Sequence, residues 1–122
     1  MPAIIGIAIA GALGALARYG LDSEFRRDPH HIPWITFAIN VSGSFALGLV
    51  VARLDAHPLR ESWLRPTITI GLLGAYTTFS TLSLETYRLL ARGQLAAALG
   101  YSLGSVVAGV AALAVGVLAG RT

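Results

Sequence analysis

Five hydroxyl side chains fall within seven residues of the chain, and they are the first group whose types and spacing could handle an ion. They are Thr77, Thr78, Ser80, Thr81 and Ser83, and Gly71 and Gly74 come just before them. A hydroxyl donates a proton without carrying a full charge. Two glycines followed by hydroxyl and β-branched residues make a poor continuous helix. The pattern predicts a helix break over about residues 74–79. The alternative is a regular helix whose hydroxyls bond back to the preceding turn.

Other neutral donors lie in apolar surroundings elsewhere in the chain. Asn40 stands near the middle of an apolar stretch, with Ser44 one helical turn later on the same face. Tyr101 and Ser105 are also one turn apart, and the ring of Phe79 has a positive edge. Asn40 could serve an ion or simply hydrogen-bond to a neighbouring helix, and its spacing leaves both interpretations open.

Full charges are scarce in the same stretches. Residues 3–19, 34–52 and 95–119 contain no Asp or Glu, Glu85 lies toward the far end of 66–90, and Arg18 is near the end of the first stretch. Cation and proton pathways usually employ carboxylates inside the membrane. Neutral donors instead favour a small anion that must lose water and leave again.

Enzyme chemistry finds no support in the sequence. There is no Cys, and the three His residues (His30, His31 and His57) all lie between the apolar stretches. The adjacent His30 and His31 do not have the i, i+4 spacing of helical ligands, and no carboxylate cluster completes a metal site. The nine arginines are scattered rather than gathered on one face, so nucleic-acid binding is not expected despite a net charge of +3.

Four apolar stretches must position these side chains. The chain has 122 residues, 55% hydrophobic and 12% charged, against about 25% charged in soluble domains, and its mean hydropathy is +0.69. About 20 apolar residues cross a bilayer, which residues 3–19, 34–52, 66–90 and 95–119 satisfy. The sequence predicts one domain over residues 1–122, an all-α membrane protein of four transmembrane helices with a broken third helix. Paired glycines at 100 and 104, and at 116 and 120, predict close helix packing.

The charges outside the four stretches give no orientation. Four crossings put the N-terminus, the 53–65 joint and the C-terminus on one side, with Arg53, Arg60, Arg65 and Arg121. The other side holds Arg18, Arg26, Arg27, Arg88 and Arg92. A basic excess normally faces the cytoplasm, and four against five is no excess. We expect insertion in both orientations and an antiparallel dual-topology homodimer. Since the middle of a four-helix bundle is filled by side chains, an ion path would run between subunits.

Two other functions compete with an anion channel. A small proton-coupled multidrug exporter can also be a four-span dual-topology dimer, but it requires a carboxylate in the middle of a span, normally the first, and residues 3–19 have none. A non-conducting helical assembly subunit would explain the paired glycines, but it leaves the hydroxyls of residues 77–83 without a reason.

Three segments give the chain a resemblance to the Fluc (CrcB) family of microbial fluoride channels, and together they extend over nearly the whole chain. They are GALGALARYG at 11–20, FAINVSGSFALG at 37–48 and GLLGAYTTFSTLSLE at 71–85. The second is similar to the family's asparagine-containing G-S-F segment, and the third to its glycine pair followed by T-T-F-S-T-F. The chain departs from the pattern at Leu82, where the family has a second phenylalanine, and at Ala75, where it usually has a glycine.

The resemblance implies a passive fluoride channel that exports F⁻ across the cell (inner) membrane. It implies an antiparallel dimer with two pores and a buried Na⁺ at its centre, held by backbone carbonyls of Gly74 and Thr77, with no organic cofactor. It makes Phe79 and Asn40 pore residues, Ser80, Thr81, Tyr101 and Ser105 a polar track, Glu85 a vestibule carboxylate and Arg18 a mouth arginine.

Overall fold

The computed structural model describes residues 1–26 and 31–122, so that Arg27 and His30 lie outside the described residues. The elements in order are α1 (Pro2–Phe25), α2 (Trp34–Asp55), the 3₁₀-helix η1 (Pro58–Glu61), α3 (Leu64–Pro66), the π-helix η2 (Thr67–Leu73), α4 (Gly74–Tyr76), α5 (Phe79–Ala91) and α6 (Leu95–Gly120).

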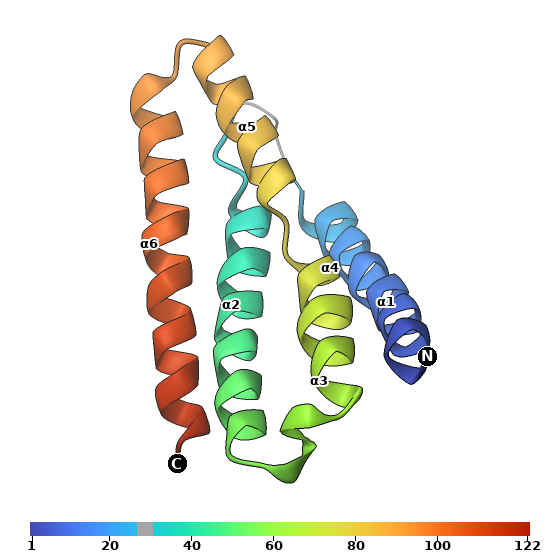
Figure 1. Cartoon of the computed structure of the whole chain (residues 1–122). Helices are drawn as coiled ribbons and strands as arrows, with labels where there is room; N and C mark the ends of the chain where they lie inside the picture. The colour runs from blue at the N-terminus through green and yellow to red at the C-terminus, as the bar shows by residue number, and fades with distance from the viewer. Residues whose placement is uncertain (27–30) are drawn as a thin grey trace.

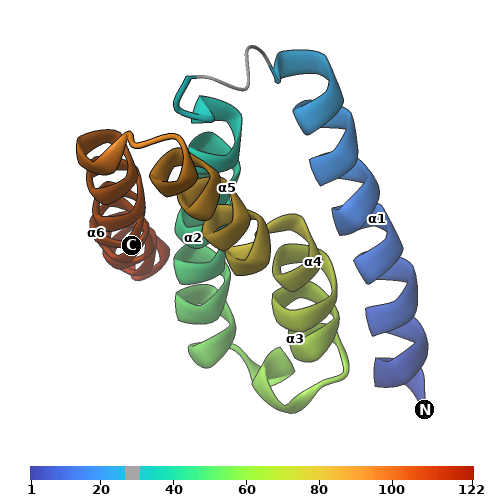
Figure 2. The same ribbon diagram turned by 90° about the horizontal axis from the view of Figure 1, so that it is seen from above.

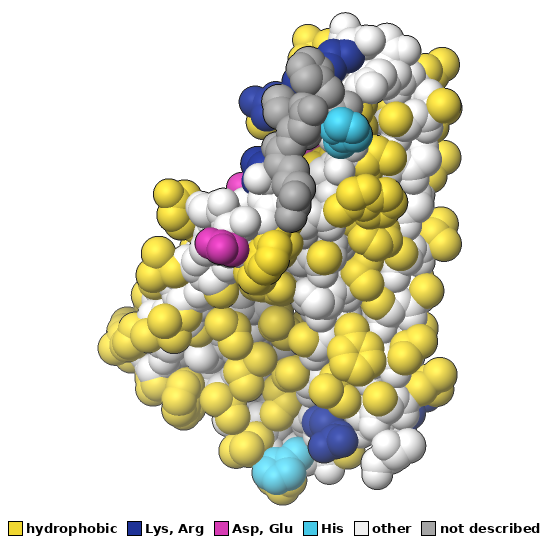
Figure 3. Space-filling model, turned by 180° about the vertical axis from the view of Figure 1, so that it is seen from behind, with side chains coloured by type: hydrophobic (Ala, Val, Ile, Leu, Met, Phe, Trp, Pro, Cys, Tyr) yellow, Lys and Arg dark blue, Asp and Glu magenta, His cyan; other side chains and the backbone are white. Residues whose placement is uncertain are grey.

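Four helical segments are long and apolar enough to cross a membrane, as the sequence predicts. They are Pro2–Phe25, Trp34–Asp55, Leu64–Ala91 and Leu95–Gly120. The first extends six residues past the predicted end at Tyr19, because a helix continues beyond the apolar stretch where its polar end can meet water. Large hydrophobic side chains are exposed along these helices, among them Ile9 at 61% and Val107 at 68%. Figure 3 shows hydrophobic side chains over much of one face, with basic and His side chains toward its two ends. Such a surface is what lipid requires.

The helices form two groups linked by the third span (Figures 1 and 2). Helices α2 and α6 lie side by side along most of their length, while α1 stands at the opposite side of the molecule. The first half of the third span, η2 and α4, packs on α1, and the second half, α5, packs on α6. Both termini and the joint between α2 and α3 lie at one end of the molecule, as four crossings demand.

Glycines allow the backbones of α2 and α6 to touch. A Cβ on Gly116 would lie 2.1 Å from the carbonyl oxygen of Phe45, and one on Gly48 would lie 2.1 Å from that of Leu113. Gly120 is similarly close to α2, whereas no atom of the described residues lies within 4 Å of a Cβ on Gly100 or Gly104. The prediction of close packing is therefore confirmed for the pair at 116 and 120. It is not confirmed within one chain for the pair at 100 and 104.

The third span is interrupted at Thr77 and Thr78, whose backbones are extended. The predicted break is confirmed, but it is narrower than residues 74–79, because Gly74, Ala75 and Tyr76 remain helical. Gly71, in the π-helix η2, packs so closely on α1 that its Cβ would be 3.0 Å from the Ile7 backbone, and this contact supports the helix there. The regular-helix alternative is wrong for the span as a whole.

Candidate functional site

The break is held open by the side-chain amide of Asn40 on α2. Its Nδ2 donates to the Thr78 carbonyl oxygen at 3.1 Å, and the Thr78 amide donates to its Oδ1 at 2.8 Å. In a continuous helix the Thr78 amide would donate to the carbonyl of Gly74, four residues back. Asn40 therefore supplies the acceptor that the Thr78 amide lacks at the break, and it gives the Thr78 carbonyl an additional donor.

One more backbone amide and one more backbone carbonyl find partners outside the helical pattern at the same place. The amide of Thr81, which would reach the Thr77 carbonyl in a continuous helix, donates to Thr78 Oγ1 at 3.2 Å, so that Thr78 caps α5. On the other side of the break, Arg18 Nε on α1 donates to the Ala75 carbonyl oxygen at 3.1 Å. Ser80 Oγ lies 3.3 Å from Thr78 Oγ1. Side chains from α1, from α2 and from the break itself thus replace the missing helical bonds.

A groove of about 320 Å³ opens beside the break. Its lining comes from α2, α5 and α6 and from the break itself, and consists of Asn40, Ser44, Thr77, Thr78, Phe79, Leu82, Ser105, Val106, Gly109, Val110 and Leu113. The Phe79 side chain at its edge is 78% exposed, while Leu82 is buried. The hydroxyl of Ser105 is buried, and the described residues give it no hydrogen-bond partner. The predicted shared face of Asn40 and Ser44 is confirmed, and the groove brings Asn40, Phe79 and Ser105 together.

Glu85 forms a second polar centre, nearer one end of the molecule. It is only 5% exposed. Thr36 Oγ1 donates to its Oε1 at 2.7 Å, and the Tyr101 hydroxyl donates to its Oε2 at 3.3 Å. Arg26, at the end of α1, lies 3.4 Å from Oε1. Tyr101 is thus turned toward Glu85 and does not line the groove with Ser105.

The remaining predicted residues lie apart from the groove. Thr81 and Arg18 line a cavity of about 220 Å³ on the α1 side of the break, together with Asp22 and Thr36. Ser80 is exposed. Within one chain the four residues of the predicted polar track therefore lie in four different environments, and Thr78 lines both the groove and the α1-side cavity.

Arg26 and Thr36 were not singled out from the sequence. The signals were present but weak: Arg26 follows Asp22 by four residues, and Thr36 precedes Asn40 by four, so each shares a helix face with a polar partner. Arg26 donates to the Asp22 carboxylate through Nε and Nη2. This hydrogen bond is the main reason that the pKa of Arg26 is raised above its ordinary value, burial acts against it, and the charge of Glu85 raises it further.

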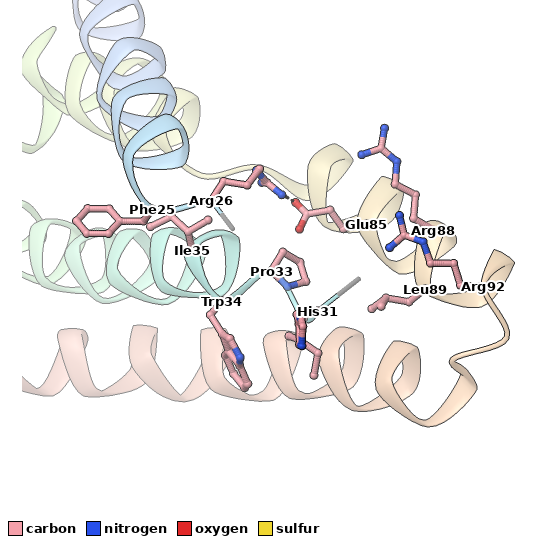
Figure 4. Close-up of a pocket in the computed structure, with 11 residues that line it drawn as sticks. Phe25, Arg26, His31, Pro33, Trp34, Ile35, Glu85, Arg88, Leu89 and Arg92 are labelled. Carbon is pink, nitrogen blue, oxygen red and sulfur yellow. Dashed lines mark hydrogen bonds and ion pairs between the residues drawn. The ribbon is translucent and has the colours of Figure 1, made fainter. Parts of the chain in front are cut away.

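Basic and apolar side chains surround the outer side of Glu85. A cavity of about 500 Å³ is lined by Phe25, Arg26, His31, Ile32, Pro33, Trp34, Ile35, Glu85, Arg88, Leu89 and Arg92. Figure 4 shows the Arg26 and Glu85 side chains reaching toward each other from α1 and α5. Among residues 1–26 and 31–122 there is no group of three or more His, Cys, Asp or Glu side chains that could hold a metal ion. A metal bound by the described residues would need other ligands, such as backbone carbonyls.

A family model described as CrcB-like protein, Camphor Resistance (CrcB), matches residues 5–117. The chain belongs to the CrcB family. The match takes in most of all four membrane-crossing segments, including the break at Thr77 and Thr78. The matched range therefore includes the residues of the break as well as those of the surrounding helices.

Curated relatives match the chain over almost all of its length. "Fluoride-specific ion channel FluC 2" of Nocardia farcinica is 42% identical over 98% of this chain and 86% of that protein. "Fluoride-specific ion channel FluC" of Paracoccus denitrificans is 44% identical over 94% of this chain and 91% of that protein. The protein of the same name from Acidobacterium capsulatum is 44% identical over 94% and 93%.

Proposed function

We propose that this chain forms a fluoride-selective channel that lets F⁻ leave the cytoplasm passively through the cell (inner) membrane. The observation that carries the proposal is the groove beside the break, where an amide, a buried hydroxyl and an aromatic edge meet without any acidic side chain. The relatives named as fluoride-specific channels support fluoride as the ion that passes. They also confirm the prediction that the chain is not an enzyme, and they do not favour the multidrug exporter.

Neutral donors suit the passage of a small anion. The Asn40 amide nitrogen has two protons, and one bond to the Thr78 carbonyl leaves the second for an ion. The Ser105 hydroxyl contributes a further donor, and the ring of Phe79 presents its positive edge. These donors replace part of the water that F⁻ loses, and without a full charge they do not hold it too tightly to leave. Ser80 and Thr81 continue the polar route, Tyr101 borders it through its hydrogen bond to Glu85, and Arg18 and Glu85 lie at its mouth.

Two copies in opposite orientations make the conducting unit. The groove is open along one side, the Phe79 side chain beside it is exposed, and Gly100 and Gly104 meet no neighbour among the described residues of one chain. A second copy laid over this side would close the groove into a corridor shielded from lipid. The balanced arginines on the two sides of the membrane support insertion both ways. Thiol labelling of a His57→Cys variant tests the topology, since the chain has no cysteine of its own. Labelling from both sides is expected, and strictly one-sided labelling would contradict dual insertion.

A sodium ion fits the backbone of the break. The carbonyls of Gly74 and Thr77 would accept from the amides of Thr78 and Thr81 in a continuous helix, and both amides donate elsewhere here. Carbonyls released in this way are the ligands that unwound membrane helices offer to Na⁺. The Ala75 carbonyl is instead held by Arg18. Bound Na⁺ would supply a fixed positive charge that stabilises the break.

Efflux from liposomes tests the proposed function. Purified protein in vesicles loaded with potassium fluoride is expected to release F⁻, followed with a fluoride electrode once valinomycin is added to balance charge. Matched vesicles loaded with potassium chloride are expected to retain most of their Cl⁻. An intact fluoride gradient in protein-containing vesicles would overturn the proposal.

A further inference from the structure

Glu85 is a buried carboxylate that receives hydrogen bonds from three other helices. Thr36 on α2 is 2% exposed and Tyr101 on α6 is 3% exposed, and the hydroxyls of both donate to it. The third donor is the guanidinium of Arg26, at the end of α1. Each hydroxyl has only one proton. While Thr36 and Tyr101 bond to Glu85, their protons are not available to a passing anion.

The position of Arg26 is itself fixed by neighbouring groups. Its Nε and Nη2 both donate to the Asp22 carboxylate one turn earlier on α1, and Nη2 also reaches Thr36 Oγ1 at 3.2 Å. The same Nη2 then lies 3.4 Å from Glu85 Oε1. One guanidinium therefore connects the end of α1 to the carboxylate on α5 (Figure 4).

The other charged and titratable groups near Glu85 come from every element packed around it. They are Asp22 on α1, His31 before α2, Tyr101 on α6, and Arg88 and Arg92 on α5. Arg26 and Arg88 are both exposed, but among the described residues no hydrogen bond or ion pair holds the Arg88 side chain, whereas Arg26 contacts Glu85. The direct ion pair with the Glu85 carboxylate is made by Arg26.

We propose that Arg26 is a positioning residue for anion passage, which neutralises the Glu85 carboxylate and holds it against Thr36 and Tyr101. This rests on the proposed fluoride channel, in which Glu85 lies at one end of the anion route. An uncompensated carboxylate in a site shielded from water would repel F⁻ strongly, because the low dielectric weakens screening. The positive charge of Arg26 offsets this repulsion, so that an anion can pass this end of the route.

Charge removal and charge rebalancing separate this role from a purely structural one. In liposome efflux, Arg26→Gln is expected to lower fluoride flux about tenfold or more, since a buried negative charge then stands alone. Arg26→Lys keeps the charge and is expected to retain most of the flux. The double variant Arg26→Gln with Glu85→Gln removes both charges, while the new side-chain amide oxygen on α5 still accepts from Thr36 and Tyr101. It is expected to return flux to within about threefold of the unmodified protein.

Arg88→Gln is the matched control, because it removes the same charge from the same cavity without touching Glu85. It is expected to leave flux within about threefold. The inference is wrong if Arg88→Gln loses as much fluoride flux as Arg26→Gln. It is also wrong if the double variant conducts fluoride as slowly as Arg26→Gln. Gel filtration shows whether Arg26→Gln folds. If it does not, the double variant decides: fluoride efflux about tenfold slower than that of the unmodified protein would overturn the inference.

The two proposals fail in different ways. If the unmodified protein leaves the fluoride gradient intact, the proposed channel function is wrong. If the unmodified protein conducts and Arg26→Gln conducts equally well, the channel function stands and only the role of Arg26 is refuted.

Discussion

The α2–α6 pair and the third span use similar residues in opposite ways. Both contain glycines among apolar side chains. In the pair, Gly48 and Gly116 bring two continuous backbones into contact. In the third span, Gly71 packs on α1, but the helix is interrupted a few residues later and its bonds are taken over by Asn40, Thr78 and Arg18. A continuous helix satisfies its own backbone, so it can serve as a scaffold. A broken helix depends on side chains from elsewhere, which leaves backbone and side-chain groups available for an ion.

Adding one methyl group to the α2–α6 contact is expected to have the largest effect. In Gly116→Ala the new Cβ would lie 2.1 Å from the Phe45 carbonyl oxygen, so the helices must separate along their length. We expect a loss of about 3 kcal/mol in the free energy of unfolding, measured by denaturation in detergent. Gly20→Ala is the control, since no atom of the part of the chain that the structure describes lies within 4 Å of a Cβ there. Equal effects of the two substitutions would mean that the contact does not support the fold.

Replacing the amide that spans the break should have the next largest effect. In Asn40→Asp the carboxylate cannot donate to the Thr78 carbonyl, and it places a negative charge in the groove. We expect fluoride flux to be abolished in liposomes. Ser42→Ala, two residues along α2 and outside the groove lining, should keep flux within about threefold of the unmodified protein. Retained flux in Asn40→Asp would remove Asn40 from the pore.

Removing the capping hydroxyl should have a moderate effect. Thr78→Val keeps the shape of the side chain but cannot accept from the Thr81 amide, so we expect a loss of about 1 kcal/mol in stability. Flux should fall as well, because the break is less well ordered. Ser83→Ala is the comparison, since its hydroxyl only bonds back to the Phe79 carbonyl on the same helix. If both variants behave alike in thermal denaturation and efflux, the cap has no special role.

A surface charge far from the break should matter least. Arg60 and Glu61 form an ion pair whose side chains are 59% and 83% exposed. Water and salt screen such a pair, so Arg60→Gln should change stability by less than about 0.5 kcal/mol and leave fluoride flux unchanged. A large loss of flux in this variant would show that the joint between α2 and α3 takes part in conduction, against a division of the molecule into scaffold and broken span.

Part of the site follows from local sequence, and part does not. The break was predictable because glycines and hydroxyl residues disfavour a helix wherever they occur, and the shared face of Asn40 and Ser44 follows from the helical repeat. The individual pairings were not. Asn40 bonds to a residue 38 positions away, and Arg26 meets a carboxylate 59 positions away. Likewise, Tyr101 and Ser105 share a helix face, yet one bonds to Glu85 and the other borders the groove.

The amino-acid order alone determined the four membrane-crossing segments, the interruption of the third and the lack of acidic side chains in the apolar stretches 3–19, 34–52 and 95–119. These properties depend on hydropathy and on local backbone preference, which each short segment carries by itself. Tertiary packing alone decided which carbonyls lose their helical donors, how far the break extends and which arginine contacts Glu85. Those outcomes depend on the side chains that neighbouring helices bring within hydrogen-bonding distance, and no single segment contains that information.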